Sequence, residues 1–263
     1  MHIEYVVASY MGDRIDKMPE YEADRAYFLR CQLASLEALD HSVKGITIVH
    51  NESGHPDERF LDTIPMRIRD ARVRVIRRPN VGFSYGAYVE AIGKTPQATH
   101  FILMEDDYVF QESGFDAWML ERMPHGMLAG AVWDWAWEQS PMMPTAAVFL
   151  GMVHADAIRS AIELGWHGKP VNSGDATYKG GYYGQVALSQ AIVQAGYELR
   201  DWLDERATAF WNSSLGRVDL FTECRSLSSV VVPIQAMGRE VPVVAAQREW
   251  KNQRELRCRI DRA

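Results

Sequence analysis

The sequence of 263 residues is poor in cysteine and carries no excess of positive charge. Its cysteines, Cys31, Cys224 and Cys258, are odd in number and lack the spacing of a zinc site, which argues against a disulfide framework. The formal net charge of −7 argues against a nucleic-acid partner, because such partners require a strongly basic face. We therefore expect free thiols in a reducing compartment.

Long apolar segments are also missing. No uninterrupted apolar run approaches the roughly 20 residues of a membrane helix. Residues 1–8 enter a strand-like run without the charged region and longer apolar stretch of a signal peptide. These absences predict no membrane span and a cytoplasmic location. With 47% hydrophobic residues, the chain has enough apolar side chains to bury the core of a single domain.

Apolar, β-branched runs alternate with helical patterns in the first half of the chain. We expect strands at residues 3–9, 46–49, 73–76 and 100–104, and helices at 23–39 and from the turn at 80–82 through residue 92. This α/β alternation predicts a mostly parallel central sheet with helices on both faces. In the less regular second half, we expect strands at 127–132 and 146–153, and helices at 155–164 and 185–195.

Polar clusters directly follow these predicted strands. They begin at Ser9, Asn51, Asn80 and Glu105. Ligands of parallel sheets bind outside the carboxyl ends of the strands, so we expect the clusters to converge on one crevice.

The most informative cluster is the acidic triplet, which consists of Glu105, Asp106 and Asp107 after the apolar residues 101–104. Clustered carboxylates at the end of a buried strand repel one another and lose solvation, unless a cation compensates them. Mg²⁺ and Mn²⁺ prefer carboxylate oxygens and also bind phosphate. Strand alternation places Glu105 and Asp107 on one side and Asp106 on the other. We expect Asp107 to bind the metal, while Glu105 and Asp106 contact the ribose or hold a metal-bound water.

On these motifs the chain resembles the GT-A glycosyltransferases, particularly their family 2 group. The resembling segments are the apolar run with its acidic triplet at 102–107, an acidic, serine-containing turn at 51–53, an Asn-x-Gly turn entering a helix at 80–87, and a strand and turn at 149–155. The resemblance implies a GT-A domain over residues 1–215, with a nucleotide-sugar-binding half at 1–110 and an acceptor-binding half at 111–215. Residues 216–263 would be a C-terminal extension.

The resemblance further implies transfer of a sugar from a UDP-, GDP- or dTDP-sugar to a hydroxyl of a glycan acceptor, with inversion and with Mn²⁺ or Mg²⁺. The residues expected to contact the nucleotide sugar are Ser9, Tyr10, Asn51, Glu52, Arg78, Asn80, Gly82, Tyr85, Glu105 and Asp106. Of the two arginines before Asn80, Arg77 and Arg78, one is expected to pair with phosphate or to cap the sheet edge.

The chain departs from the family pattern at the catalytic base. Family 2 members carry an acidic residue where the helix ending at Gly196 opens, but here residues 183–185 contain no carboxylate. The candidate bases are therefore Asp175 and Asp134, which would deprotonate the acceptor hydroxyl. An exposed turn aspartate is the alternative for Asp175.

Aromatic residues dominate the expected acceptor side. Trp133, Trp135 and Trp137 alternate as on a strand, which suits either stacking on a sugar ring or core packing. Tyr182 lies beside glycines and suits a lid that excludes water. His154 follows a predicted strand and is a further candidate ligand to the metal or the pyrophosphate, or a structural histidine.

Two other functions compete with this interpretation. A nucleotidyltransferase would have a similar sheet, but the loop after the first strand contains one glycine, Gly12, which is too few to wrap a triphosphate. A non-catalytic carbohydrate-binding protein with the same fold would need no catalytic base, which fits the absence of a carboxylate at residues 183–185. A dinucleotide-dependent dehydrogenase is disfavoured, because no Gly-x-Gly-x-x-Gly follows a predicted strand.

Overall fold

The structure is a computed structural model that describes residues 1–14, 19–110, 113–129, 131–135, 143–147, 151–166, 184, 187–201 and 231–233. At 131–135, 143–147, 201 and 231–233, only the backbone is described.

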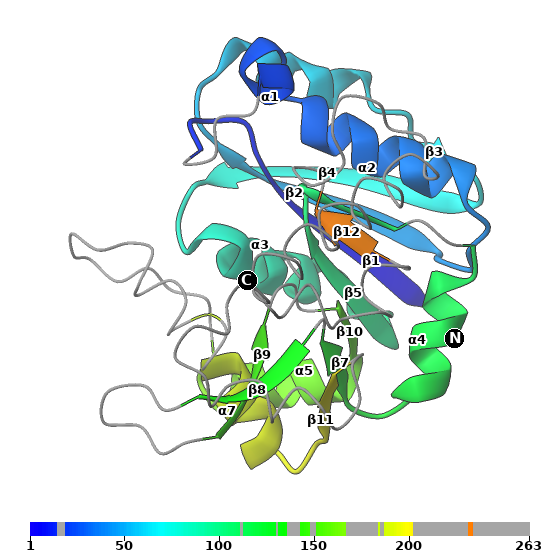
Figure 1. Cartoon of the computed structure of the whole chain (residues 1–263), viewed down its shortest axis with the longest axis vertical. Coiled ribbons are helices and arrows are strands. Elements are labelled where there is room, and N and C mark those ends of the chain that lie inside the picture. The colour runs from blue at the N-terminus through cyan, green and yellow to red at the C-terminus, as the bar shows by residue number, and fades with distance from the viewer. Residues whose placement is uncertain are drawn as a thin grey trace, which may run out of the picture.

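An eight-stranded sheet forms the centre of the described part of the chain, in the order β11-β7-β10-β5-β1-β2-β4-β3 (Figure 1). Its strands are β1 (Ile3–Tyr10), β2 (Gly45–Glu52), β3 (Arg67–Ile68), β4 (Ala71–Pro79), β5 (His100–Glu105), β7 (Met127–Ala129), β10 (Gly151–His154) and β11 (Leu199–Asp201). Strands β5, β1, β2 and β4 are parallel neighbours, as predicted. The sheet is nevertheless mixed, because β10 is antiparallel to both β5 and β7, and β3 is antiparallel to β4.

Two short antiparallel pairs accompany the main sheet. Strand β8 (Ala131–Trp135) pairs with β9 (Met143–Ala147). Strand β6 (Tyr108–Phe110), which begins directly after Asp107, pairs with β12 (Val231–Pro233). A segment of the expected C-terminal extension thus lies beside the chain that leaves the acidic triplet.

Helices cover both faces of the sheet, as predicted. They are α1 (Pro19–Ala23), α2 (Tyr27–Ala38), the 3-10 helix η1 (Pro56–Thr63), α3 (Phe83–Lys94), α4 (Phe115–Arg122), α5 (Ala155–Glu163) and α7 (Ala187–Gln194). Alternate residues of β5 enter opposite cores: Ile102 and Met104 join α2 and α4, whereas Phe101 and Leu103 join α3, α5 and α7. This burial on both faces explains the continuous apolar run before Glu105.

Three predicted elements are divided in the structure. Residues 127–132, expected as one strand, contribute to β7 and β8, and residues 146–153 contribute to β9 and β10. Strand β10 starts at Gly151, which has a φ of 72°. Its α-carbon approaches β7 so closely that a Cβ would lie 2.2 Å from the Leu128 carbonyl oxygen. The expected helix at 23–39 begins at Tyr27, after the short helix α1.

The direction of the connections reverses at β1. From β1 the chain passes to β2 and β4 on one side, and α3 then carries it back to β5 on the other side (Figure 1). The carboxyl ends of β1 and β5 consequently lie side by side, with Ala8 opposite Glu105. Because ligands of open α/β sheets bind at such a reversal, the fold places the acidic triplet at the expected ligand edge.

Among the described residues, none of the helices combines the length and the apolar composition needed to cross a membrane.

The tight contact at Gly151 yields a test of this strand arrangement. We expect Gly151→Ala to lower the free energy of unfolding by roughly 2 to 4 kcal/mol, because the new Cβ adds backbone strain and meets the neighbouring strand. Urea denaturation measures the change.

Gly93→Ala is the matched control. A Cβ at Gly93, in α3, meets no atom within 4 Å. Since alanine favours helix more than glycine does, this substitution should raise stability by up to about 1 kcal/mol. Equal effects of the two substitutions would contradict the close approach of β10 to β7.

Candidate functional site

The first carboxylate of the acidic triplet faces the start of α3. Glu105 is the last residue of β5, and its Oε1 accepts a 2.8 Å hydrogen bond from the Ser84 hydroxyl. Burial and the negative charge of Asp107 raise the pKa of Glu105 to about 7, although the Ser84 hydrogen bond opposes the rise. Glu105 is therefore a poorly solvated carboxylate that gains from a nearby cation.

The second carboxylate, Asp106, is bound to other groups of the protein itself. Asp106 is 3% exposed, and its Oδ2 accepts a 2.9 Å hydrogen bond from the Tyr10 backbone N–H. Its Oδ1 forms an ion pair with the guanidinium of Arg14. Asp106 thus fastens the loop after β1 to the end of β5. The structure assigns Asp106 to this contact rather than to the expected ribose contact. Glu105 and Asp106 contact different neighbours, but Arg14 lies near both Asp106 and Asp107. Strand β5 ends at Glu105, so the expected strand alternation does not extend through the triplet.

Arg14 is a fixed positive charge that was missing from the predicted site. Its Nη1 lies 3.8 Å from Asp107 Oδ2, and its guanidinium carbon lies 5.0 Å from the Tyr21 ring centroid and 4.8 Å from that of Phe28. Burial would lower the Arg14 pKa, but Asp106 and Asp107 raise it instead, so the cation stays charged. One guanidinium therefore faces a group of three carboxylates.

The remaining pair, Glu105 and Asp107, suits a divalent cation that also binds phosphate. In the described part of the chain, no group of three His, Cys, Asp or Glu side chains is arranged to hold a metal ion. Mg²⁺ is commonly held by one or two carboxylates together with substrate phosphates and water. Glu105 and Asp107, separated by one residue at the end of β5, could supply the two carboxylates of such a donor set.

His154 lies at the opposite end of the strand. It pairs with His100, the first residue of β5, whereas Glu105 is the last. Its Nδ1 accepts a 3.2 Å hydrogen bond from the Asp156 backbone N–H at the start of α5. The expectation that His154 is a ligand beside Asp107 is therefore wrong. The antiparallel course of β10 carries it away from the carboxyl edge.

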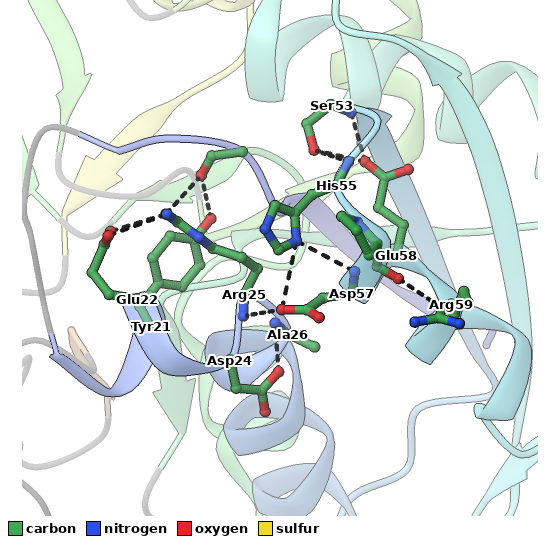
Figure 2. A network of polar contacts seen from close by, with 12 residues as sticks. Tyr21, Glu22, Asp24, Arg25, Ala26, Ser53, His55, Asp57, Glu58 and Arg59 are labelled. Atoms are coloured by element: carbon green, nitrogen blue, oxygen red, sulfur yellow. Dashed lines mark hydrogen bonds and ion pairs between the residues drawn. The ribbon is translucent and has the colours of Figure 1, made fainter.

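A rigid loop follows β2 at the same edge of the sheet. Glu58 accepts hydrogen bonds from the Ser53 backbone N–H at 2.6 Å and the Ser53 hydroxyl at 2.7 Å (Figure 2). It also accepts one from the Gly54 backbone N–H at 3.0 Å. Its Oε1 is also 3.2 Å from His50 Nε2. Burial alone would raise the Glu58 pKa, but these contacts lower it to about 2. The loop is held further by Asp57, which accepts from the Arg25 backbone N–H at 2.9 Å.

Three residues expected to contact the nucleotide sugar differ in how far their side chains are exposed. Ser9 is fully buried, with its hydroxyl 3.3 Å from His50 Nδ1, so it supports the loop from beneath. Tyr10 is partly buried, and Glu52, the last residue of β2, is exposed.

A second hydrogen-bond network holds the turn between β4 and α3. Arg78 donates to Asn51 Oδ1 at 2.6 Å and to the Val81 carbonyl at 2.8 Å. Asn51 in turn donates to the Phe83 carbonyl at 3.3 Å. Arg78 and Asn51 thus hold the turn that contains Asn80 and Gly82, and their expected contacts with the nucleotide sugar stay predictions.

The other arginine, Arg77, pairs with Asp62 at 2.7 Å. Strand β3 pairs only with Ala71 and Arg72 at the start of β4, so it does not cover the edge of β4 at Arg77 and Arg78.

One described residue of the irregular second half contacts this edge. A Cβ at Gly184 would lie 2.1 Å from Tyr85 Cε2, and the Gly184 carbonyl accepts a 3.2 Å hydrogen bond from the Trp166 indole. The chain at Gly184 thus packs on Tyr85, in the first turn of α3.

The candidate base Asp175 and the candidate acceptor contact Tyr182 lie outside the described residues, as does Trp137. Asp134, Trp133 and Trp135 lie on β8, where only the backbone is described.

No protein-family model matches this sequence, and no curated protein matches it. Among solved structures, the chain is similar to TarS 1–349 from S. aureus in complex with UDP, at 10% identity and a TM-score of 0.49, over 96% of this chain and 70% of that one. It is also similar to 4-diphosphocytidyl-2C-methyl-D-erythritol synthase from Anaerococcus prevotii, at 11% identity and a TM-score of 0.49, over 86% of this chain and 96% of that one. A likeness at this level does not identify what the chain binds.

The buried ion pair can be tested by a double-mutant cycle. Arg14→Gln should lower the free energy of unfolding by about 3 to 5 kcal/mol, because it leaves the buried Asp106 carboxylate without its counter-charge. Combining it with Asp106→Asn should cost less than the sum of the two single changes, by 1 kcal/mol or more. Chemical denaturation measures each value.

Lys94→Gln, which breaks the exposed pair with Glu90, is the control and should cost about 0.5 kcal/mol or less. Additive effects of Arg14→Gln and Asp106→Asn would contradict a direct interaction.

Glu105 makes stability depend on pH. Its folded pKa of about 7 lies above its ordinary value of 4.5, so the folded state holds the proton more tightly. This contribution is complete below pH 4.5 and is lost as the pH rises through 7, by roughly 3 kcal/mol in all. Glu105→Gln is neutral throughout, so it should stabilise the protein relative to wild type at pH 8 but not at pH 4. The same stability difference at both pH values would contradict the raised pKa.

Proposed function

We propose that this chain is a metal-dependent glycosyltransferase that moves a sugar from a nucleoside-diphosphate sugar to a hydroxyl of a glycan acceptor. The observation that carries the proposal is the pair Glu105 and Asp107 at the end of β5, where the sheet connections reverse. Asp106, between them, is occupied by Arg14 and by the Tyr10 backbone.

Charge explains why this pair suits a nucleoside diphosphate. Two carboxylates repel a diphosphate unless a divalent cation lies between them, and Glu105 is already costly to ionise in its surroundings. Mn²⁺ or Mg²⁺, held by Asp107 with Glu105, would supply Lewis-acid stabilisation of the departing diphosphate. Ser84 orients Glu105 through its 2.8 Å hydrogen bond.

Neighbouring elements complete a site for the donor. Helix α3 begins at Phe83, beside Ser84 and Glu105, and the positive end of a helix favours phosphate. The loop held by Glu58 and the turn held by Arg78 stand at the ends of β2 and β4, on one side of the carboxylate pair. They form preorganised walls for the nucleoside.

The acceptor belongs on the other side, toward β10 and β7. The contact of Gly184 with Tyr85 supports this arrangement, because it brings the second half of the chain against α3. We propose that the catalytic base is Asp175 or Asp134 and that Trp133, Trp135 and Tyr182 contact the acceptor. A base opposite the departing diphosphate would give inversion.

Arg14 argues against a nucleotidyltransferase. In a nucleotidyltransferase, the loop after the first strand would have to present its positive charge to a triphosphate. Here the Arg14 guanidinium is turned inward to Asp106 and Asp107. We therefore rank sugar transfer ahead of nucleotidyl transfer.

The proposal predicts metal-dependent binding of one nucleoside diphosphate. We expect UDP, GDP or dTDP to raise the melting temperature of the full chain only when Mn²⁺ is present, because a ligand of the native state stabilises it by mass action. Asp107→Asn should abolish the shift while retaining the circular dichroism spectrum of wild type.

Asp70→Asn, in the exposed turn between β3 and β4, is the matched control and should keep the full shift. If Asp107→Asn retains the shift, or if none of the nucleotides produces one, the proposed site is wrong.

A further inference from the structure

An exposed aromatic residue in a strained conformation stands beside the carboxylate pair. Phe83 is 44% exposed, has a φ of 51°, and precedes Ser84, whose hydroxyl binds Glu105. Left-handed backbone is unfavourable for a residue with a Cβ and is ordinarily occupied by glycine. In the described part of the chain, Arg69 is the one other non-glycine residue with a positive φ.

The surrounding hydrogen bonds hold Phe83 in this conformation. Asn51, which is 3% exposed, donates to the Phe83 carbonyl, and Arg78 joins Asn51 to the carbonyl of Val81. Gly86 leaves room for the turn, since a Cβ there would lie 2.3 Å from the Val81 carbonyl oxygen. Side chains from β2 and β4 thus fix a turn that presents an aromatic ring to solvent.

Packing does not account for this ring. Phe83 is absent from both apolar cores of the described residues, and the neighbouring Val81 is also 44% exposed. Strained backbone persists where the surroundings over-determine it, and it concentrates at ligand sites. The position of Phe83 beside a hydrogen-bonded carboxylate therefore points to a ligand that covers the ring.

We propose that Phe83 is a stacking platform for the nucleobase of the nucleotide donor, an inference that rests on the proposed function. With the diphosphate at Glu105 and Asp107, the nucleoside extends toward the ends of β2 and β4, because the acceptor half occupies the other side. The Phe83 carbonyl accepts from Asn51 of β2, which Arg78 of β4 holds in turn, so Phe83 lies on the nucleoside side. Every nucleobase has a π-face, so Phe83 adds affinity without selecting the base.

The test compares two ligand sizes on the full chain in Mn²⁺. Calorimetric titrations use UDP, GDP and dTDP in parallel, together with inorganic pyrophosphate, which lacks a base. Phe83→Gly should weaken binding of whichever nucleotide binds by about tenfold and leave pyrophosphate unchanged, since base stacking contributes about that factor. Phe83→Tyr should restore wild-type affinity. Without ligand, Phe83→Gly should melt at the wild-type temperature or above it, because glycine adopts this φ without strain.

Met66→Ala is the matched control. Met66 is 77% exposed and lies before β3, at the amino end of β4. This variant should bind every ligand as wild type does. Wild-type nucleotide affinity in Phe83→Gly would overturn the platform, and so would an equal loss for nucleotide and pyrophosphate, which would indicate a structural role. In a parallel titration with a free methyl glycoside, loss of binding in Phe83→Gly while nucleotide affinity stays at the wild-type value would overturn the platform and assign the ring to the acceptor. If wild type binds neither nucleotide nor pyrophosphate, the proposed function itself fails, which is a separate result.

Discussion

The ion pair between Arg14 and Asp106 is the contact on which the geometry of this site depends. It joins the loop after β1 to the end of β5 across 92 positions of sequence, at the point where the sheet connections reverse. Aromatic rings of Tyr21 and Phe28 support the guanidinium. Arg14 also lies 3.8 Å from Asp107, but Asp106 is the member of the triplet that both Arg14 and the Tyr10 backbone hold.

The same contact leaves the site with a deficit of positive charge. The single guanidinium of Arg14 is shared between Asp106 and Asp107, while burial and the charge of Asp107 raise the pKa of Glu105. Clustered carboxylates cost free energy in the fold, and in the proposed function a cation with its phosphate ligand would offset that cost. The walls around it are rigid by contrast: Glu58 fixes the loop after β2, and Arg78 fixes the turn before α3. These hydrogen bonds hold both neighbouring segments in place beside the carboxylates.

The sequence predicted the parallel core well and the contacts of individual side chains poorly. Apolar runs marked β1, β2, β4 and β5, because burial on both faces leaves a clear pattern. The direction of β10 leaves no such pattern, so His154 was placed at the wrong end of β5. Sequence reasoning misses Arg14 because its partner is distant in the sequence; an arginine in the loop after the first strand is the available signal. The pairings of Asn51 with Arg78 and of Ser9 with His50 likewise arise only from neighbouring strands.

A crystal grown with Mn²⁺ and a nucleoside diphosphate tests the central claim most directly, because manganese is located by its anomalous scattering. The account predicts one peak between the carboxylates of Glu105 and Asp107, with diphosphate oxygens completing the coordination and Arg14 still paired with Asp106. Nucleotide bound at another place, or manganese bound away from the end of β5, would contradict it.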